Sequence, residues 1–414
     1  MYNSSTATER SVSLPKAWEM KRLGDVCEVI AGQSPEGKYY NETGEGLPFY
    51  QGKKEFTEKY IGEPTKWTTK ITKEAIENDI LMSVRAPVGP INFSTQRICI
   101  GRGLAAIRSN GLIDKEFLFN FLLKHENEIV GNTGAVFNSI NKAQIEVIEI
   151  LLPPLPEQKR IVSMLDRAFE AIDKAKANAE QNLKNAKELF ESYLQGVFDP
   201  STRSGQGNKG DDWEEKKLNE ISEVKDGTHD SPKYIKEGIP FVTQKNIKPD
   251  GFTIENTKFI TEVDHQKFYK RSNVTFGDIL MSMIGANRGM SAIVDIKDTF
   301  SIKNVGLIKK SKNINQFFLL YYLQSPLAMK YVKFKSNGGA QEFIGLRALR
   351  AFPIPFPKSK EEQKQIVKKL DTLSAETKKL EAIYQQKIDN LEELKKSILQ
   401  KAFNGELTEK GLSV

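Results

Sequence analysis

The chain of 414 residues is too long for one ordinary hydrophobic core, so two or three domains are expected. Hydrophobic residues make up 39% and charged residues 28%, which excludes a disordered chain and a fibrous repeat. No apolar run is long enough for a membrane span, and the net charge of +7 permits a polyanionic partner. Two cysteines and three scattered histidines predict neither a disulfide framework nor a metal site, so a cytoplasmic location is the simplest expectation.

The second half of the sequence repeats the first. The string WE at residue 18 recurs at 213, DILMS at 79 recurs at 278, and EQK at 157 recurs at 362. Several matches in the same order indicate a tandem duplication. The chain therefore reads as globule, helix, globule, helix.

The first copy begins after a tail, residues 1–13, that is predicted to be disordered. In the first globule, residues 14–155, Gly and Pro interrupt short β-prone runs such as Phe93–Ala106. A helical pattern covers Asp114–Ile129. These alternating signals predict a mixed α/β domain.

A long helix is predicted over residues 156–199, because apolar positions keep spacings of three and four residues for more than four heptads. Pro156 fits its first turn, and Asp199-Pro200 fits its end. Its predicted seam is Ile161, Leu165, Ala168, Ile172, Ala175, Ala179, Asn182, Ala186, Phe190 and Tyr193.

A polar, glycine-rich linker at 200–212 leads to a second α/β globule over 213–358, with a β-prone run at Ser291–Ile308 and a helical pattern at Asn315–Lys333. The second long helix is predicted over 359–405, with a capping box at Ser359 and Glu362. Its predicted seam is Ile366, Leu370, Leu373, Thr377, Leu380, Tyr384, Lys387, Leu391, Leu394 and Ile398.

The alanine-rich seam of the first helix complements the bulkier seam of the second, which predicts that the two helices pair. The alternative is that each helix packs only on its own globule. The helices are nearly neutral, with seven Lys and Arg against eight Asp and Glu in 157–199 and nine against seven in 362–404. Most of the positive excess therefore lies outside the helices, so the globules are the better candidates for contacting phosphates.

Three short patterns were tested as catalytic or nucleotide-binding motifs, and each favours a structural explanation. GLPFYQGKK at 46–54 has the wrong spacing for a phosphate-binding loop, and no helix follows the glycines of IGRGLAA at 100–106. The prolines at 153–154 and 355–357 lack the Asn and aromatic residue of a base-methylating loop and are interpreted as joints before the long helices. No catalytic machinery is predicted.

Polar and aromatic residues in the turn-rich parts of the globules suggest DNA contacts, since Gln, Asn, Arg and Lys match base edges and phosphates. Each of them could equally be a solvated loop residue. In the first globule the candidates are Gln33, Ser34, Lys38, Tyr39, Gln51, Lys53, Arg85 and Asn138. In the second globule they are Thr228, His229, Lys233, Tyr234, Gln244, Lys245, Asn287, Arg288, Asn337 and Gln341.

Across essentially its whole length, the chain resembles the specificity subunit of type I restriction-modification systems. The resemblance rests on the Trp-x-x-x-x-Leu opening of each half, Asp226–His229 followed by PKY, SVRAPVG at 83–89, Pro-x-x-Glu-Gln before the first long helix, and the paired Leu-x-x-Ser-x-Leu-Gln endings. It implies a non-catalytic chain in which each globule recognises half of a split, asymmetric DNA target. The two helices are then an antiparallel coiled coil that acts as a ruler between the half-sites.

The resemblance also implies partners. Two modification subunits would dock on the helices, bring S-adenosylmethionine and methylate adenine, and restriction subunits would add ATP- and Mg²⁺-dependent functions. Two alternatives stay open at this point: a structural coiled-coil protein with globular caps, and the recognition module of a type II restriction-methylase.

Overall fold

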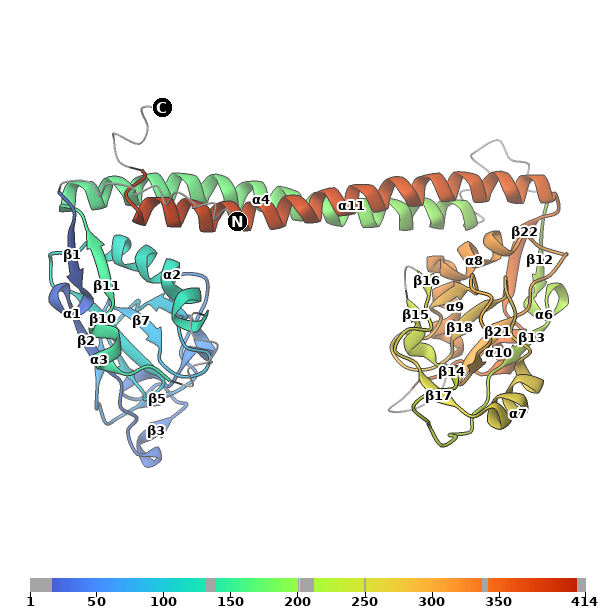
Figure 1. Ribbon diagram of the computed structural model, residues 1–414, viewed down its shortest axis with the longest axis horizontal. Helices are drawn as coiled ribbons and strands as arrows, with labels where there is room; N and C mark the ends of the chain where they lie inside the picture. The colour runs from blue at the N-terminus through green and yellow to red at the C-terminus, as the bar shows by residue number, and fades with distance from the viewer. Residues whose placement is uncertain are drawn as a thin grey trace, which may run out of the picture. The chain divides into compact units, whose positions relative to one another are not determined.

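The computed structural model describes residues 17–131, 139–199, 201, 212–248, 251–336 and 342–407. It divides into two compact units: unit 1 is Met1–Ala179 with Gln386–Val414, and unit 2 is Glu180–Gln385. Each unit contains a globule and a segment of both long helices, α4 (Leu155–Phe198) and α11 (Lys360–Phe403) (Figure 1). The predicted tail and nearly all of the predicted linker lie outside the described residues, and the predicted domain boundaries stay predictions.

Unit 1 is built on two sheets. The four-stranded antiparallel sheet has the order β2 (Cys27–Ala31), β10 (Leu104–Ser109), β7 (Ile80–Ser83) and β8 (Ile91–Phe93). The five-stranded sheet has the order β3 (Tyr40–Asn41), β5 (Trp67–Thr68), β4 (Leu47–Tyr50), β9 (Ile98–Ile100) and β6 (Glu74–Ala75), with β4 and β9 parallel. The remaining elements are the β1–β11 pair (Glu19–Arg22 and Glu149–Leu152), helices α1 (Leu23–Val26), α2 (Lys115–Gly131) and α3 (Lys142–Glu146), and 3-10 turns η1 (Gly37–Tyr39) and η2 (Lys53–Glu55).

The central strands β7 and β10 of unit 1 are apolar except at their last residues, because both faces of the sheet are covered there. Alternate residues of β7 face opposite cores, as the period of two in a strand requires. Ile80 and Met82 join the core that contains Phe117 of α2, whereas Leu81 joins the core that contains Tyr50. Helix α2 lies between this sheet and the paired long helices (Figure 1).

Unit 2 repeats this plan. Its antiparallel sheet has the order β13 (Val224–Asp226), β21 (Val305–Ile308), β18 (Ile279–Ser282) and β19 (Ser291–Ile293). A three-stranded sheet has the order β17 (Lys258–Ile260), β14 (Ile239–Val242) and β20 (Ser301–Ile302), with β14 and β20 parallel. Two-stranded pairs are β12–β22 (Trp213–Lys217 and Pro353–Pro357) and β15–β16 (Ile247–Lys248 and Gly251–Phe252). The helices are α6 (Leu218–Ile221), η4 (Gln244–Asn246), α7 (Glu262–Ser272), α8 (Gln316–Gln324), α9 (Pro326–Lys335) and α10 (Leu346–Arg350).

Two sequence-based interpretations of unit 2 need correction. The pattern at Asn315–Lys333 forms two helices rather than one, because Ser325 caps a new helix by accepting a hydrogen bond from Ala328 N at 3.2 Å, with a proline at its first position. The prolines before α11 lie within β22 rather than only in a joint. This strand pairs on one side only, where a proline without an N–H is tolerated.

The repeated Glu-Gln motif buries one glutamine in each unit. Gln158 accepts a hydrogen bond from Asp114 N at 2.7 Å and donates one to the carbonyl of Pro153 at 2.8 Å. Gln363 does the same with Asn315 N at 2.8 Å and the Pro357 carbonyl at 2.8 Å. Because a buried amide needs such partners, the motif ties the start of each long helix to its globule.

The two long helices pair within each unit. In unit 1, Lys176 contacts Glu392 at 2.8 Å and Asp173 contacts Lys395 at 3.0 Å. A step of three residues backward in α4 is matched by a step of three forward in α11, so the helices are antiparallel. In unit 2, Leu194 of α4 shares a core with Leu370 of α11. The predicted antiparallel pairing of the helices is confirmed.

The end of each long helix is also buried in a globule. Phe403 of α11 packs on Phe117 and Phe121 in unit 1, with ring centroids 4.9 and 5.7 Å apart. Phe198 of α4 packs in the same way on Phe318 and Tyr322 in unit 2, at 5.4 and 5.2 Å. The helices therefore pair with each other and also pack on the globules, so the two predicted arrangements are not exclusive.

The predicted seam is correct for α4 up to Ala179, and in α11 it differs from the structure at three positions. All six seam positions from Ile161 to Ala179 are buried or half-buried. In α11 the shared positions Leu370, Thr377, Tyr384, Leu391 and Ile398 are buried or half-buried, but Leu380 is 38% exposed. Ile366 and Leu373 are also half-buried, as predicted, whereas Lys387 and Leu394 are exposed like Leu380. The structure buries or half-buries Glu381, Ile388 and Lys395 in place of these three residues.

An apolar side chain does not by itself mark the seam, as the exposed Leu380 shows. Both choices keep spacings of three and four residues, so the sequence pattern alone does not separate them. In the same way, Asn182 and Tyr193 of α4 are exposed while Leu183 is half-buried and Leu194 is buried.

No helix in the part of the chain that the structure describes has the length and apolarity to cross a bilayer.

Candidate nucleic-acid interface

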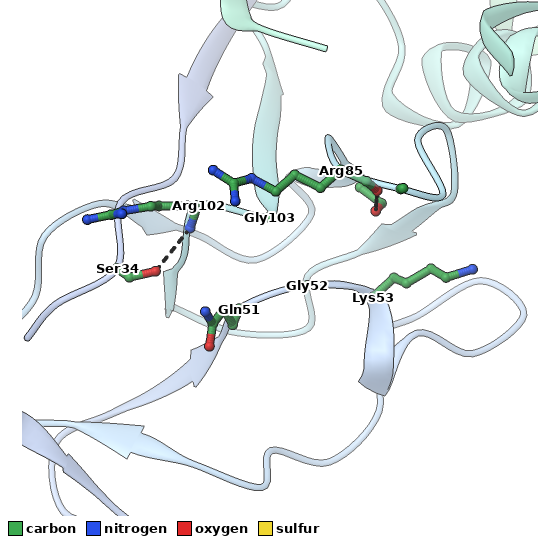
Figure 2. A pocket seen from close by; sticks show the side chains of 9 residues that line it. Ser34, Gln51, Gly52, Lys53, Arg85, Arg102 and Gly103 are labelled. Carbon is green, nitrogen blue, oxygen red and sulfur yellow. Dashed lines mark hydrogen bonds between the residues drawn. The ribbon is translucent and has the colours of Figure 1, made fainter. Parts of the chain in front are cut away.

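A surface cavity of about 500 Å³ lies in unit 1 at the loops that follow β2, β4, β7 and β9 (Figure 2). It brings together four of the predicted DNA-binding residues. Its lining consists of Ser34, Gln51, Gly52, Lys53, Ser83, Arg85, Ala86, Arg102 and Gly103. Three of these residues are basic and none is acidic, so the cavity suits an anionic or hydrogen-bond-accepting ligand.

The floor of this cavity is a tight loop between β9 and β10. Gly101 N donates to the carbonyl of Tyr50 at 2.8 Å, and Gly103 N donates to the carbonyl of Gln51 at 3.0 Å. A Cβ on Gly103 would lie 2.3 Å from that same Gln51 oxygen, so only glycine permits this approach. Arg102 between the two glycines is exposed, and its backbone N donates to Ser34 Oγ at 3.2 Å.

Three other predicted DNA-binding residues of unit 1, Gln33, Lys38 and Tyr39, do not line the cavity. Gln33 is exposed, and its carbonyl accepts a hydrogen bond from Thr72. Lys38 pairs with Glu36 at 2.8 Å and lies 5.1 Å from the ring centroid of Tyr39, outside the cavity lining.

Two local charges affect the edge of the cavity. Burial raises the pKa of the Glu126 carboxyl in α2, and the positive charge of Lys53 partly opposes this shift. Lys53 therefore faces an acid as well as the cavity. In Figure 2 its side chain extends away from Arg85 and Arg102. Among the described residues, none of the three cationic side chains of the lining forms an ion pair, and Lys53 is the one whose charge acts on a nearby acid.

In unit 2 the corresponding region is the end of β13 and the turn between β20 and β21, which we call the strand-end corner. It holds a different set of side chains on a similar backbone. His229 Nδ1 lies 2.7 Å from Asn304 Oδ1, and its Nε2 lies 3.2 Å from Asp226 Oδ2. Asp226 also accepts two hydrogen bonds from Arg271, at 3.0 and 2.6 Å. Thr228 is buried beside this network. This corner is therefore cross-linked by its own side chains.

The remaining predictions in unit 2 divide into anchored and exposed residues. Arg288 is anchored, since it donates to Ser336 Oγ at 2.9 Å and to the Gly285 carbonyl at 3.2 Å and pairs with Glu342. Gln244 accepts a hydrogen bond from Ser282 Oγ at 3.2 Å, while the ring of Tyr234 lies 4.3 Å from Lys258 Nζ. Lys233, Lys245 and Asn287 are exposed. Asn138, Asn337 and Gln341 lie outside the described residues.

The prediction missed Arg102 in unit 1 and its counterparts Lys303 and Asn304 in unit 2. The glycine pair at 101 and 103 was noticed but was tested only as a dinucleotide-binding motif. An exposed arginine between two glycines that follow an apolar strand was the available signal. It marks a side chain presented on a tight turn, which is where ligand contacts concentrate.

Two α/β globules on paired helices, one of them with a cationic cavity at its strand ends, define a class of two-part recognition proteins. The family model described as "Type I restriction modification DNA specificity domain" matches residues 15–184 and again residues 210–392. The chain belongs to this family of type I restriction-modification specificity subunits. This membership favours the recognition function over the structural and type II alternatives.

Individual relatives agree with this assignment. The chain is 43% identical over 188 residues to the MjaX specificity subunit of Methanocaldococcus jannaschii, but the match spans only 44% of each protein. It is 26% identical to the MjaVIII specificity subunit of the same organism, over 97% of this chain and 95% of that one.

Solved structures show the same fold. A chain from a structure on complex assembly and conformational transition of the type I R-M system matches with a TM-score of 0.76 at 21% identity, over 95% of this chain and all of that one. The HsdS subunit of Thermoanaerobacter tengcongensis matches with a TM-score of 0.59 at 20% identity, over 97% of this chain and all of that one.

Proposed function

We propose that each unit recognises one half of a bipartite, asymmetric DNA target, and that the paired helices set the length of the unread spacer. The observation that carries this proposal is the double family match, one copy per unit. The acid-free cationic cavity of unit 1 supports it, because arginine, lysine and glutamine supply the donors that base edges and phosphates accept.

The chain itself is proposed to be non-catalytic. Its partners would be two modification subunits that use S-adenosylmethionine to methylate adenine, and restriction subunits that use ATP and Mg²⁺. A base must leave the stack before it can be methylated. The modification subunits would therefore bind the target base at the half-site that each unit recognises. A cytoplasmic location fits such a complex.

An apolar groove on the paired helices of unit 2 is the proposed docking surface for a modification subunit. The groove has a volume of about 590 Å³ and is lined by Leu189, Tyr193, Gln365, Lys368, Lys369, Thr372, Leu373 and Glu376. Two of its lining residues are large and exposed, Leu189 at 50% and Tyr193 at 37%. Large exposed side chains in one stripe indicate a surface that a protein partner covers.

The test is methylome sequencing of cells that express this chain with a type I modification subunit. A single motif of two defined half-sites separated by unread bases is expected. Cells with the modification subunit alone are the control and should lack the motif. Absence of any bipartite motif, although the complex assembles, would refute the proposal and favour a scaffolding role.

The ruler function has its own test. One heptad inserted into α4 and one into α11 would lengthen the paired helices by about 10 Å, which corresponds to roughly three base pairs of duplex. The unread spacer is expected to change by one to three base pairs, while both half-sites stay the same. A control variant with seven substitutions at exposed positions of each helix and no inserted residues should keep the original spacer. A constant spacer in the insertion variant would contradict the ruler function.

A further inference from the structure

The cavity of unit 1 contains a feature that the proposed function does not by itself require. Arg102 is exposed, whereas Gly101 and Gly103 on either side of it are buried. One arginine is thus presented at the tip of a turn whose backbone is enclosed. The arrangement raises the question of what this side chain contacts when DNA is bound.

The backbone that carries Arg102 is fixed from three sides. Hydrogen bonds hold Gly101 and Gly103 to the end of β4, and Ser34 Oγ holds the N–H of Arg102 itself. An added Cβ on Gly101 would lie 3.0 Å from both Gln51 Cα and Ser34 Oγ. The turn is therefore packed without space for rearrangement, and a directional contact from Arg102 would lose little backbone entropy on binding.

The guanidinium of Arg102, like that of Arg85 in the same cavity, has no acidic partner among the described residues, in contrast to two other arginines of unit 1. Arg108 is held by Asp79 at 2.8 Å, and Arg97 is held by Glu74 at 2.7 Å. Within the described ranges of the chain, Arg102 has no ion pair and its side chain has no hydrogen bond. An exposed, unneutralised guanidinium on a rigid turn retains all five of its donors for a ligand.

The chemistry of the cavity favours a base over a phosphate at this position. A phosphate is a diffuse target that a flexible lysine can satisfy, and Lys53 is available for it. A guanine presents two adjacent acceptors, O6 and N7, in the major groove, and a planar guanidinium matches them with two parallel hydrogen bonds. The pinned turn supplies the fixed direction that such a contact needs.

Resting on the proposed function, we infer that Arg102 reads a guanine in the half-site recognised by unit 1. Unit 2 has no arginine at this turn. Its counterpart residues are Lys303, whose N–H donates to the Val242 carbonyl as that of Gly101 donates to Tyr50, and Asn304, which is tied to His229. The guanine contact is therefore specific to one half-site, so it contributes to the asymmetry of the target.

The experiment compares the methylated motif of the wild-type complex with those of Arg102→Ala and Lys53→Ala, each expressed with the modification subunit. Arg102→Ala is expected to relax one guanine position in one half-site, with discrimination there falling about 5- to 150-fold, while the other half-site stays unchanged. Lys53→Ala removes the same charge from the same cavity and is expected to lower methylation equally across sequences, without relaxing any position.

A second measurement keeps the inference testable if methylation by the Arg102→Ala complex is too weak to define a motif. Duplexes of the wild-type motif are prepared with 7-deazaguanine, which lacks the N7 acceptor, at each guanine in turn. The wild-type complex is expected to lose affinity for one such duplex, and the Arg102→Ala complex should bind that duplex and its normal counterpart equally well.

The outcomes separate this inference from the function on which it rests. A wild-type complex without any bipartite motif would overturn the proposed function. A bipartite motif whose guanines are read equally well by the Arg102→Ala complex would overturn only the role of Arg102. Loss of affinity in Arg102→Ala that Arg102→Lys restores, with guanine discrimination unchanged in both variants, would also overturn it, because that pattern indicates a charge contact to a phosphate and not a base contact.

Discussion

The strand-end corners of the two units share their backbone hydrogen bonds but not their side chains. Gly32 N donates to the Leu104 carbonyl at 2.9 Å in unit 1, and Gly227 N donates to the Val305 carbonyl at 2.9 Å in unit 2. On this common frame, unit 1 places the free Arg102 above Ser34. Unit 2 places His229 in a closed network with Asp226.

The difference shows which part of the duplication was kept and which part diverged. Backbone contacts that hold the sheets together recur, because the same strand order must be stabilised in both units. The exposed side chains are not needed for that stability, so they are free to differ. Two similar units with different reading surfaces are what an asymmetric bipartite target requires.

The largest effect on the methylated motif is expected when the two globules are made identical. Replacing the globule of unit 1 by a second copy of the globule of unit 2 is expected to convert the asymmetric motif into one with two identical half-sites. Methylome sequencing measures this outcome. The control is a chain in which the unit 1 globule is replaced by itself through the same junctions, and it should keep the wild-type motif. An unchanged asymmetric motif in the exchanged chain would mean that the corners do not determine the half-sites.

A smaller effect is expected at the ion pairs that join the ends of the two central strands in each antiparallel sheet. In unit 2 the fully buried Asp278 accepts hydrogen bonds from Lys309 Nζ, Lys310 N and Thr275 N. Asp278→Ala leaves Lys309, which is only 14% exposed, without its counter-charge. The free energy of local opening of β18 and β21 should fall by about 3 kcal/mol, as measured by hydrogen exchange.

The matching pair in unit 1 is expected to lose less. The hydrogen bond that Arg108 donates to Asp79 raises the pKa of Arg108, which stays charged, but Arg108 is 30% exposed and also contacts Glu28 at 3.4 Å. Asp79→Ala should therefore cost only about 1–2 kcal/mol, since water and Glu28 still stabilise the guanidinium. Asp298→Ala, at an exposed position of unit 2, should change neither sheet. Equal losses at Asp278 and Asp79 would contradict this comparison.

An effect of similar size to that at Asp79 is expected at the glycine turn that distinguishes unit 1. Gly103→Ala places a methyl group 2.3 Å from the Gln51 carbonyl oxygen, so the turn must shift at a cost of about 1–3 kcal/mol. Faster hydrogen exchange in β9 and β10 and weaker binding of the wild-type motif are expected.

Gly52→Ala is the matched control for this turn. Gly52 lines the same cavity in an extended conformation, and no atom lies within 4 Å of an added Cβ. This substitution should leave hydrogen exchange in β9 and β10 unchanged. Identical behaviour of the Gly52 and Gly103 variants would show that the turn is looser than the close approach implies.

Sequence analysis found several residues of the candidate site but not their relation to each other. Ser34, Gln51, Lys53 and Arg85 were selected by residue type and by their turn-rich surroundings, and they line one cavity. They come from the three segments that follow β2, β4 and β7, so only the packing of two sheets brings them together. Arg288 was selected by the same criteria, yet its side chain is held by Ser336 and Glu342. Residue type shows what a side chain can bind, whereas its partners show whether it is available.

The duplication, the α/β character of the two globules and the two long helices were determined by the sequence itself. They depend on repeated strings and on periodic apolar spacing, which are local properties of the chain. Tertiary structure decided which positions complete the α11 seam, in which Leu380 is exposed and Ile388 is buried, because both choices have the same spacing and only the partner helix selects one. It also decided that Arg102 is presented to solvent, since that depends on how closely Gly103 approaches the backbone of Gln51 in another strand's loop.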